Sequence, residues 1–469
     1  MASSTSLHFL LVPLMSQSHL IPFTNMAQLL ASRGLNVTLV VTPQNAARIN
    51  TIIVNHDSQE SDLGRTIQLL EAGSSSVCGS NDPFLASNMM QEPLENWLQT
   101  VSLLPDCIVS DFCLPWTSDL ARKFGIPKVV FHTISCFSLL CSQNISIHKA
   151  YETVKSHSEP FLVPDIPDKI TFTKAQLPTT GASDQWINLL TQFNLSEKSS
   201  DGVLVNSFQE MEPGYVEGYR KQVKNLWCIG PLRGNKGASI DHDGHDCLSW
   251  LDTKDEKSVI YVCFGSISNL SSKQLIELGL GLEASGSPFI WIIKKTDCSP
   301  ELENWFAEEK FVERTKGRGL IIRGWAPQVL ILSHPAIGGF LTHCGWNSIL
   351  EGISAGVPML TWPMFAEQFF NEAFMVEVLK IGVRLGVVRP AGEKEKEKEK
   401  EDVLVMKEEV AKGVKEVVDG GEDGEWRRKR AREVGEMGKR AVEGGSSYSN
   451  VTSLIEYVMQ LKMSRISPI

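Results

Sequence analysis

One local pattern restricts the fold of this chain more than any other: a short apolar run, a segment with helical spacing, and a second short apolar run. Its first copy has apolar runs at 7–14 and 36–42 on either side of a helical pattern over 21–32. Units of this kind build parallel sheets whose faces are covered by helices. The chain is therefore predicted to belong to the α/β class.

The same pattern starts again beyond a polar stretch near the middle of the chain. Residues 231–246 are rich in Gly and Asp, which is typical of an exposed linker. A length of 469 residues is also too great for a single hydrophobic core. We predict a first domain over 1–235, a linker over 236–246, a second domain over 247–452, and a terminal helix, 453–469, that returns to the first domain.

Composition excludes several classes of protein. A formal net charge of -10 disfavours nucleic acid or an anionic membrane as the main partner. The ten cysteines are scattered without zinc spacing, so we expect reduced thiols in a cytoplasmic protein and no metal. The apolar stretch 7–15 has no basic residue before it and contains Pro13, which favours a buried strand over a signal peptide. We expect no integral membrane segment, and a monomer.

The segment most informative about chemistry lies between 337 and 355. A short apolar strand is followed by a tight turn at 342–345 and then by a helix that begins at Trp346. The turn brings His343, Asn347 and Ser348 to a helix N-terminus, where backbone N–H groups and the helix dipole favour an anion. A pyrophosphate group would fit this position.

Two further residues extend this anion site toward a nucleotide. Glu351 lies four residues after Asn347, on the same helix face, where a carboxylate can accept hydrogen bonds from ribose hydroxyls. Trp325 follows an apolar run and offers a flat face to a base. Singly, Trp325 could be a core residue, His343 a buried histidine with a partner, and Asn347 a helix cap. The ordered set favours a nucleotide site.

The segment from Trp325 to Gln368 closely resembles the 44-residue signature box of plant secondary-metabolite UDP-glycosyltransferases, the inverting glycosyltransferase family 1. The likeness extends over nearly the whole chain, including 13–15 with His19, 264–266 and 444–448. It implies a GT-B fold, in which two Rossmann-like parallel-sheet domains face each other across a cleft. The N-terminal domain would bind the acceptor and the C-terminal domain the UDP-sugar.

The resemblance also assigns roles to individual residues. Trp325 would stack on uracil, Glu351 would hold the ribose, and Glu367 and Gln368 would bind the hexose hydroxyls. Family members often have Asp where this chain has Glu367. UDP-glucose would be the co-substrate, with no metal cofactor. The donor-binding set that the resemblance implies is Thr133, Ser266, Trp325, Ala326, Gln328, His343, Trp346, Asn347, Ser348, Glu351, Glu367 and Gln368.

The family's catalytic pair corresponds to His19, in the predicted loop after the first strand, and Asp111, after the strand that ends at Ser110. Taken alone, each residue could be purely structural. Ligands of doubly wound sheets bind beyond the carboxyl ends of the strands, where both residues are expected, so they become a candidate base and its orienting group. One departure from the family is a shortened segment over 63–88, which leaves the choice of acceptor open.

The resulting hypothesis is inverting transfer of glucose from UDP-glucose to a hydroxyl of a small lipophilic acceptor, of phenolic/flavonoid or terpenoid/steroid type. His19 would be the general base, assisted by Asp111. Two alternatives stay open: a UDP-sugar epimerase of the same architecture, and a non-catalytic binder of nucleotide-sugars or small molecules. Phe112, Trp116, Phe137 and Leu140 are candidates for the acceptor lining, although a core position is favoured for each of them.

Overall fold

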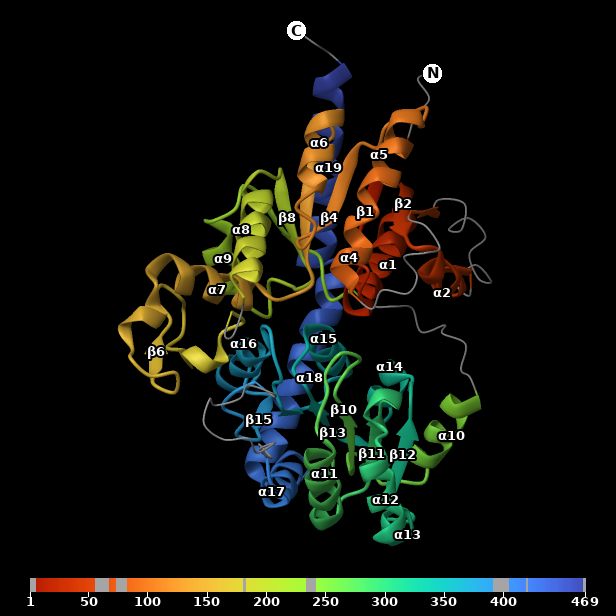
Figure 1. Ribbon diagram of the computed structural model, residues 1–469, viewed down its shortest axis with the longest axis vertical. Helices are drawn as coiled ribbons and strands as arrows, with labels where there is room; N and C mark the ends of the chain where they lie inside the picture. The colour runs from red at the N-terminus through yellow and green to blue at the C-terminus, as the bar shows by residue number, and fades with distance from the viewer. Residues whose placement is uncertain are drawn as a thin grey trace. The chain divides into compact units, whose positions relative to one another are not determined.

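The computed structural model describes residues 6–54, 67–72, 82–179, 183–232, 242–390, 405–418 and 421–466. The chain divides into two units, each built on a parallel sheet (Figure 1). The first consists of 1–136, 182–239 and 440–469, and the second of 137–181 and 240–439. Residues 137–181, which sequence analysis placed in the first domain, therefore group with the second. Half of the shortened segment 63–88 and the first half of the predicted linker lie outside the described residues.

In the described part of the first unit, seven parallel strands are ordered β3-β2-β1-β4-β5-β8-β9. Their interiors are apolar because helices cover both faces of the sheet. The strands are β1 (His8–Val12), β2 (Asn36–Val41), β3 (Ile67–Glu71), β4 (Cys107–Asp111), β5 (Lys128–His132), β8 (Gly202–Val205) and β9 (Leu226–Cys228). The helices are α1 (Gln17–Ser32), α2 (Pro43–Val54), α4 (Pro83–Asn88), α5 (Gln91–Thr100), α6 (Thr117–Phe124), α8 (Asp184–Lys198), α9 (Pro213–Arg220) and α19 (Ser446–Ile466).

Helix α1 begins earlier than the sequence pattern predicts. Ser16 takes the N-cap position, with an extended φ of -105° and ψ of 143°, and the backbone N–H groups of His19 and Leu20 donate to its carbonyl oxygen. The placement of His19 in a loop was wrong, because His19 lies in the first helical turn. A polar first turn after a serine cap has the same composition as a polar loop, so composition could not separate the two.

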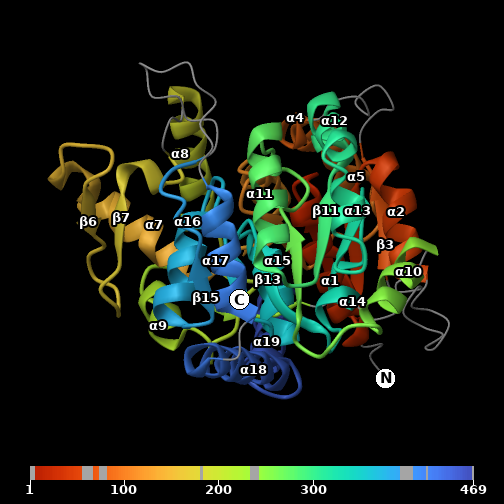
Figure 2. The ribbon, with the colours of Figure 1, turned by 90° about the horizontal axis from the view of Figure 1, so that it is seen from below.

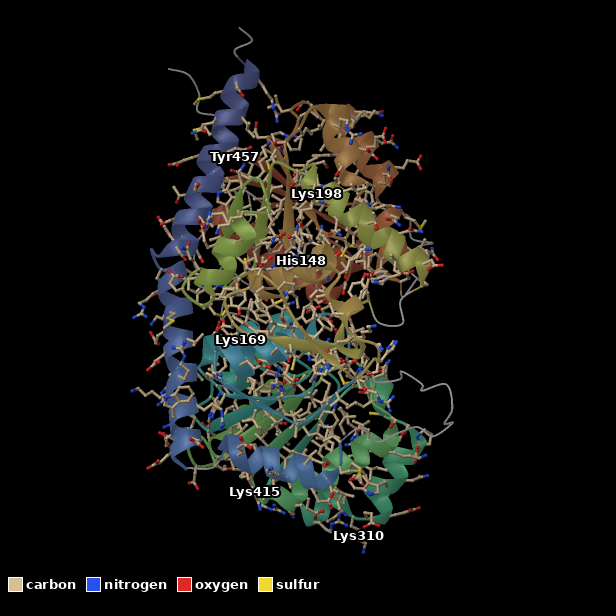
Figure 3. All side chains as sticks on the ribbon, turned by 90° about the vertical axis from the view of Figure 1, so that its left-hand side faces the viewer. His148, Lys169, Lys198, Lys310, Lys415 and Tyr457 are labelled. Atoms are coloured by element: carbon tan, nitrogen blue, oxygen red, sulfur yellow. The ribbon has the colours of Figure 1, made fainter. Side chains whose placement is uncertain are left out.

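The C-terminal helix α19 belongs to the first unit. Tyr457 of this helix (Figure 3) packs against Trp227 of β9, with ring centroids 5.4 Å apart. The indole N–H of Trp227 also donates to the hydroxyl of Ser453 over 3.3 Å. Val451, Leu454 and Val458 complete the contact, since they join the same hydrophobic core as β1 and β2.

In the described part of the second unit, six parallel strands are ordered β12-β11-β10-β13-β14-β15. These strands are β10 (Val259–Cys263), β11 (Phe289–Ile293), β12 (Gly319–Arg323), β13 (Ile337–Thr342), β14 (Met359–Thr361) and β15 (Gly382–Arg384), and β6 (Pro160–Leu162) pairs antiparallel with β7 (Thr171–Thr173). The helices are α7 (Cys136–His148), α10 (His242–Leu251), α11 (Ser272–Ser285), α12 (Pro300–Glu308), α13 (Phe311–Arg314), α14 (Gln328–Leu332), α15 (Trp346–Ala355), α16 (Gln368–Ala373), α17 (Lys407–Val418) and α18 (Glu422–Val442), and a π-helical turn (Phe374–Val378) continues α16.

Helices α11 and α17 lie side by side at one face of the second sheet (Figure 2). Leu278 and Leu282 of α11 pack with Val410 and Val414 of α17 in one apolar cluster.

The predicted linker 236–246 extends too far, because helix α10 already begins at His242. Its buried residues Cys247 and Leu251, spaced by four, anchor the helix despite the Gly and Asp content of its first turn.

Three of the four candidates for an acceptor lining are core residues. Trp116, Phe137 and Leu140 are at most 8% exposed, whereas Phe112 is partly buried. Phe112 follows Asp111 and packs against the ring of His132, with centroids 4.4 Å apart.

Among the described residues, no helix is both long and apolar enough to cross a membrane.

A β-bulge at Gly338 sets the register of the strand that leads to the predicted anion site. Val259 of β10 pairs with Ile337 of β13, but the next residue, Ile260, pairs with Gly339. Gly338 is the extra residue, and a Cβ atom there would lie 2.0 Å from the carbonyl oxygen of Lys257. Only glycine permits this approach of the two backbones.

We predict that Gly338→Ala destabilises the protein by about 1–3 kcal/mol, because the added methyl group must push β13 away from β10. Urea titration followed by tryptophan fluorescence would measure the loss. UDP affinity should fall together with stability, since β13 carries the turn at 342–345. An unfolding midpoint equal to that of the wild type would show that the bulge tolerates a side chain.

Candidate active site

His19 and Asp111 form a hydrogen-bonded pair at the carboxyl edge of the first sheet. His19 Nδ1 lies 2.7 Å from Asp111 Oδ2. The pair forms because β1 and β4 are adjacent parallel strands, so α1 starts beside the last residue of β4. The His19 side chain is 23% exposed and Asp111 is 1% exposed, which leaves the histidine accessible and the carboxylate enclosed. Thr133 lies at the same edge, directly after β5.

Asp111 is held as a carboxylate by its surroundings. Burial alone would raise its pKa, but His19 and the backbone N–H groups of Cys113 and Leu14 lower it below the ordinary value. These N–H groups donate over 3.0 Å and 3.3 Å. An ionised carboxylate can only accept, so His19 Nδ1 carries a proton, and whenever the ring is neutral its lone pair is on Nε2. The pair therefore has the orientation of a base and its carboxylate partner.

A second group of predicted residues meets at the carboxyl edge of the second sheet. Gln328 Nε2 donates to Glu351 Oε2 over 2.7 Å and to Ser348 Oγ over 3.2 Å. Tyr261, which sequence analysis did not identify, donates its hydroxyl to Gln328 Oε1 over 3.2 Å. Burial raises the pKa of Glu351 while Gln328 opposes the rise. These hydrogen bonds fix the side chains relative to one another.

Trp325 and Ala326 differ sharply in exposure. The Trp325 side chain is 63% exposed, whereas Ala326 is buried beside it. A large indole that stays in solvent is uncommon unless it serves an interaction. The structure thus rejects the alternative of Trp325 as a core residue and leaves its ring face open to a planar group.

The turn 342–345 is shaped around the ring of His343. A Cβ atom on Gly265 or Gly345 would approach that ring to 2.6 Å or 2.3 Å, so both glycines are needed for its position. Cys344 has a φ of 65°, a left-handed conformation that costs a residue with a side chain about 1 kcal/mol or more. The N-cap residue of α15 is Gly345, which has no side chain to cap the helix. This helix N-terminus is consistent with an anion site.

His343 is neutral at physiological pH. Burial lowers its pKa to about 4, with a smaller contribution from Lys294. Its Nδ1 is buried, and no described residue pairs with this atom. The other residues predicted to hold the diphosphate differ in burial. Trp346 is buried, Asn347 is partly buried, and Ser266 is exposed.

Glu367 and Gln368 lie at the start of α16, next to a strained loop. Ala366 has a φ of 54°. Gln368 is buried, and its Oε1 accepts hydrogen bonds from the backbone N–H groups of Met364 and Phe365 over 2.8 Å and 3.1 Å. Its amide nitrogen is therefore the part suited to bind a ligand. Glu367 Oε1 accepts a hydrogen bond from Asn371 Nδ2 over 3.3 Å.

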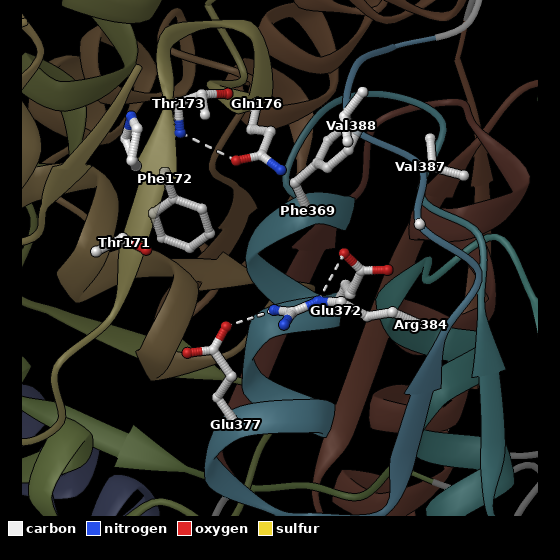
Figure 4. Close-up of a pocket in the computed structure, with 12 residues that line it drawn as sticks. Thr171, Phe172, Thr173, Gln176, Phe369, Glu372, Glu377, Arg384, Val387 and Val388 are labelled. Atoms are coloured by element: carbon white, nitrogen blue, oxygen red, sulfur yellow. Dashed lines mark hydrogen bonds and ion pairs between the residues drawn. The ribbon is translucent and has the colours of Figure 1, made fainter. Parts of the chain in front are cut away.

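A cavity of about 230 Å³ lies beside α16, within the second unit (Figure 4). Phe172 and Phe369 form part of its wall, and Arg384 reaches Glu372 over 3.3 Å and also pairs with Glu377. Burial raises the pKa of Glu372 to about 7, although Thr361 and Arg384 oppose the rise. This ionic group ties α16 and the π-helical turn to β15.

Comparison with known proteins identifies the family. A family model described as UDP-glucoronosyl and UDP-glucosyl transferase matches residues 214–388. UDP-glycosyltransferase 73C12 of Barbarea vulgaris is 47% identical to this chain over 494 residues, with 98% of each chain covered. UDP-glycosyltransferase 73C5 of Arabidopsis thaliana is 45% identical, again with 98% of each covered. This chain belongs to the UDP-glycosyltransferase family.

Solved structures of UDP-glycosyltransferases share its fold. Glycyrrhiza uralensis UGT73P12, complexed with glycyrrhetinic acid 3-O-monoglucuronide, superposes with a TM-score of 0.86 at 34% identity, covering 98% of this chain and 97% of that one. Phytolacca americana UGT2, complexed with UDP-2fluoro-glucose and pterostilbene, gives a TM-score of 0.77 at 28% identity, covering 97% and 100%. The prediction of a GT-B fold is confirmed, as is the prediction of a plant-type glycosyltransferase.

The low pKa of His343 predicts a specific pH dependence of stability in this UDP-glycosyltransferase. The unfolded chain takes up this proton near pH 6.5 and the folded chain only near 4, so folding loses up to roughly 3 kcal/mol as the pH falls from 6.5 to 4. A His343→Gln variant should lose less stability than the wild type across that window. Urea titrations at several pH values would measure the difference.

The matched control is His148→Gln, at the half-exposed histidine labelled in Figure 3. The comparison separates loss of the His343 ring from the effect of a His→Gln substitution at another position. If His343→Gln lost as much stability at acid pH as the wild type does, a low pKa of His343 could not be the cause of that loss. This result would contradict the account.

Proposed function

We propose that the protein is an inverting glucosyltransferase that moves glucose from UDP-glucose to a hydroxyl of a small lipophilic acceptor, of phenolic/flavonoid or terpenoid/steroid type. His19 acts as general base, assisted by Asp111, without a metal cofactor. The single observation that carries the proposal is the 2.7 Å hydrogen bond between His19 and the buried Asp111. It supports a base that is oriented before substrate arrives.

The chemistry needs a base because a protonated hydroxyl is a poor nucleophile toward the anomeric carbon. His19 Nε2 takes the hydroxyl proton while the new glycosidic bond forms and the bond to the diphosphate breaks on the opposite face. The ring then carries a positive charge, which the Asp111 carboxylate stabilises, as the acid of a hydrolase triad does. The proton later passes to solvent.

The second unit supplies groups suited to the leaving nucleotide. Trp325 offers its exposed face to uracil, Ala326 and Gln328 lie beside it, and Glu351 has a free lone pair for the ribose. The α15 N-terminus stabilises the charge that develops on the diphosphate. The residues proposed for the diphosphate are Ser266, His343, Trp346, Asn347 and Ser348, and those proposed for the hexose from this unit are Glu367 and Gln368. Thr133, also proposed for the hexose, belongs to the first unit.

The ligands of related structures support a sugar nucleotide as donor and a small lipophilic molecule as acceptor. The Phytolacca americana structure holds UDP-2fluoro-glucose with pterostilbene, and the Glycyrrhiza uralensis structure holds glycyrrhetinic acid 3-O-monoglucuronide. A sugar nucleotide and a small lipophilic molecule are therefore the substrates we propose for this chain.

His19→Ala should lower kcat by on the order of 10² to 10⁴, the usual contribution of a general base, while UDP affinity stays close to that of the wild type. Asp111→Ala should give a smaller loss, because the ring remains but its orientation is no longer fixed. Product formation with UDP-glucose and a mixed phenolic and terpenoid acceptor library, together with calorimetric UDP binding, measures both effects.

A His19→Ala enzyme with wild-type turnover would remove this residue from the mechanism. A parallel loss of UDP affinity would make it a binding residue. In wild-type reactions, isomerised UDP-sugar without conjugates would indicate an epimerase, and binding without turnover would indicate a carrier.

UDP-glucose should be preferred over UDP-glucuronate by at least about tenfold in kcat/KM. The extra carboxylate of the glucuronate would meet the carboxylate of Glu367, and an unpaired desolvated charge is costly. A competition assay with both donors present measures the ratio directly. Equal or faster use of UDP-glucuronate would contradict this view of the hexose site.

A further inference from the structure

Asn371 is a fully buried polar residue on α16, outside the set that the sequence pattern identified. Its side chain makes three hydrogen bonds. Asn371 Nδ2 donates to the backbone carbonyl of Cys344 over 2.9 Å and to Glu367 Oε1 over 3.3 Å, and its Oδ1 accepts from the Ser138 hydroxyl over 2.9 Å. A buried amide with this many partners is fixed in one orientation.

The chemistry of the partners determines which way the amide points. A peptide carbonyl and a carboxylate have lone pairs but no hydrogen to donate, so both must face the NH₂ group. The opposite orientation would place the amide oxygen against two acceptors. The hydroxyl of Ser138, from α7, then donates a hydrogen bond to the amide oxygen of Asn371.

The two acceptors belong to different parts of the donor site. Cys344 is the left-handed residue of the turn that presents His343 and begins α15. Glu367 is the carboxylate proposed to bind the hexose. One NH₂ group therefore holds the diphosphate turn and the hexose carboxylate at a fixed separation.

We propose that Asn371 is a positioning residue that couples these two parts of the site and so determines hexose selectivity. It would not touch the substrate itself. The inference rests on the proposed function, because it takes Glu367 as a hexose ligand and the turn 342–345 as a diphosphate site. Loss of the amide would let both groups relax independently.

The test compares Asn371→Asp, Asn371→Ala and the control Ser138→Ala, which keeps both donor contacts of the amide. Calorimetry measures UDP affinity from pH 5 to 8, and initial rates give kcat/KM for UDP-glucose and UDP-galactose. Both Asn371 variants should bind UDP about tenfold more weakly at pH 8 and lose several-fold in the glucose-to-galactose ratio. Ser138→Ala should stay within about twofold of the wild type in both.

The pH series separates positioning from general destabilisation. A protonated Asp can donate to Cys344 as the amide does, so the affinity of Asn371→Asp relative to the wild type should recover as the pH falls, whereas that of Asn371→Ala should not. The hexose ratio does not depend on the fraction of folded enzyme, so it remains informative if a variant is unstable. Wild-type values of both quantities in folded Asn371 variants would overturn the inference. A wild-type protein that does not bind UDP would instead overturn the proposed function.

Discussion

Parallel strand pairing is the constraint on which the rest of this molecule depends. In a parallel sheet all strands end at one edge, and each following turn opens a helix at that edge. In the first unit this brings Asp111, at the end of β4, to His19 in the helix after β1. In the second unit β10 and β13 end side by side, which places Gly265 against His343. The polar residues are therefore gathered by the topology, although they are far apart in sequence.

Polar groups with several partners each then fix the geometry at these edges. Asp111 accepts hydrogen bonds from His19 and two backbone N–H groups, and Gln328 contacts Tyr261, Ser348 and Glu351. Such networks are costly when one member is missing and rigid when all are present. A site of this kind needs little rearrangement when charge develops during the reaction, which is the basis of electrostatic catalysis.

Sequence predicted some parts of the site to within one residue. The strand, turn and helix from 337 to 355 were predictable because apolar alternation, glycines and a helical pattern follow one another without ambiguity. The start of α1 was not predictable, because a serine cap and a polar first turn have the composition of a loop. Likewise, the Gly and Asp residues at 242–246 indicated a linker, whereas the buried Cys247 and Leu251 hold a helix there.

Residues that act through distant partners gave no signal in the sequence. In the sequence Tyr261 is an ordinary strand residue, and only the structure shows its hydroxyl bonded to Gln328. The proposed role of Asn371 likewise depends on its hydrogen bonds to Cys344 and Glu367, which the sequence does not indicate. The grouping of 137–181 with the second unit is similar, because it depends on long-range contacts such as Ser138 with Asn371. Periodicity reports which face of an element is buried, but not which partner it meets.

The central claim is that His19 removes a proton from the acceptor. Its most direct test is the ratio of wild-type to His19→Ala kcat for a series of acceptors whose hydroxyls differ in acidity. A base matters most for an aliphatic alcohol and least for an acidic phenol, which ionises without help. The account predicts a ratio of roughly 10² to 10⁴ for the alcohol that shrinks steadily toward the most acidic phenol. A ratio that stays constant across the series would contradict it, because His19 would then contribute something other than proton removal.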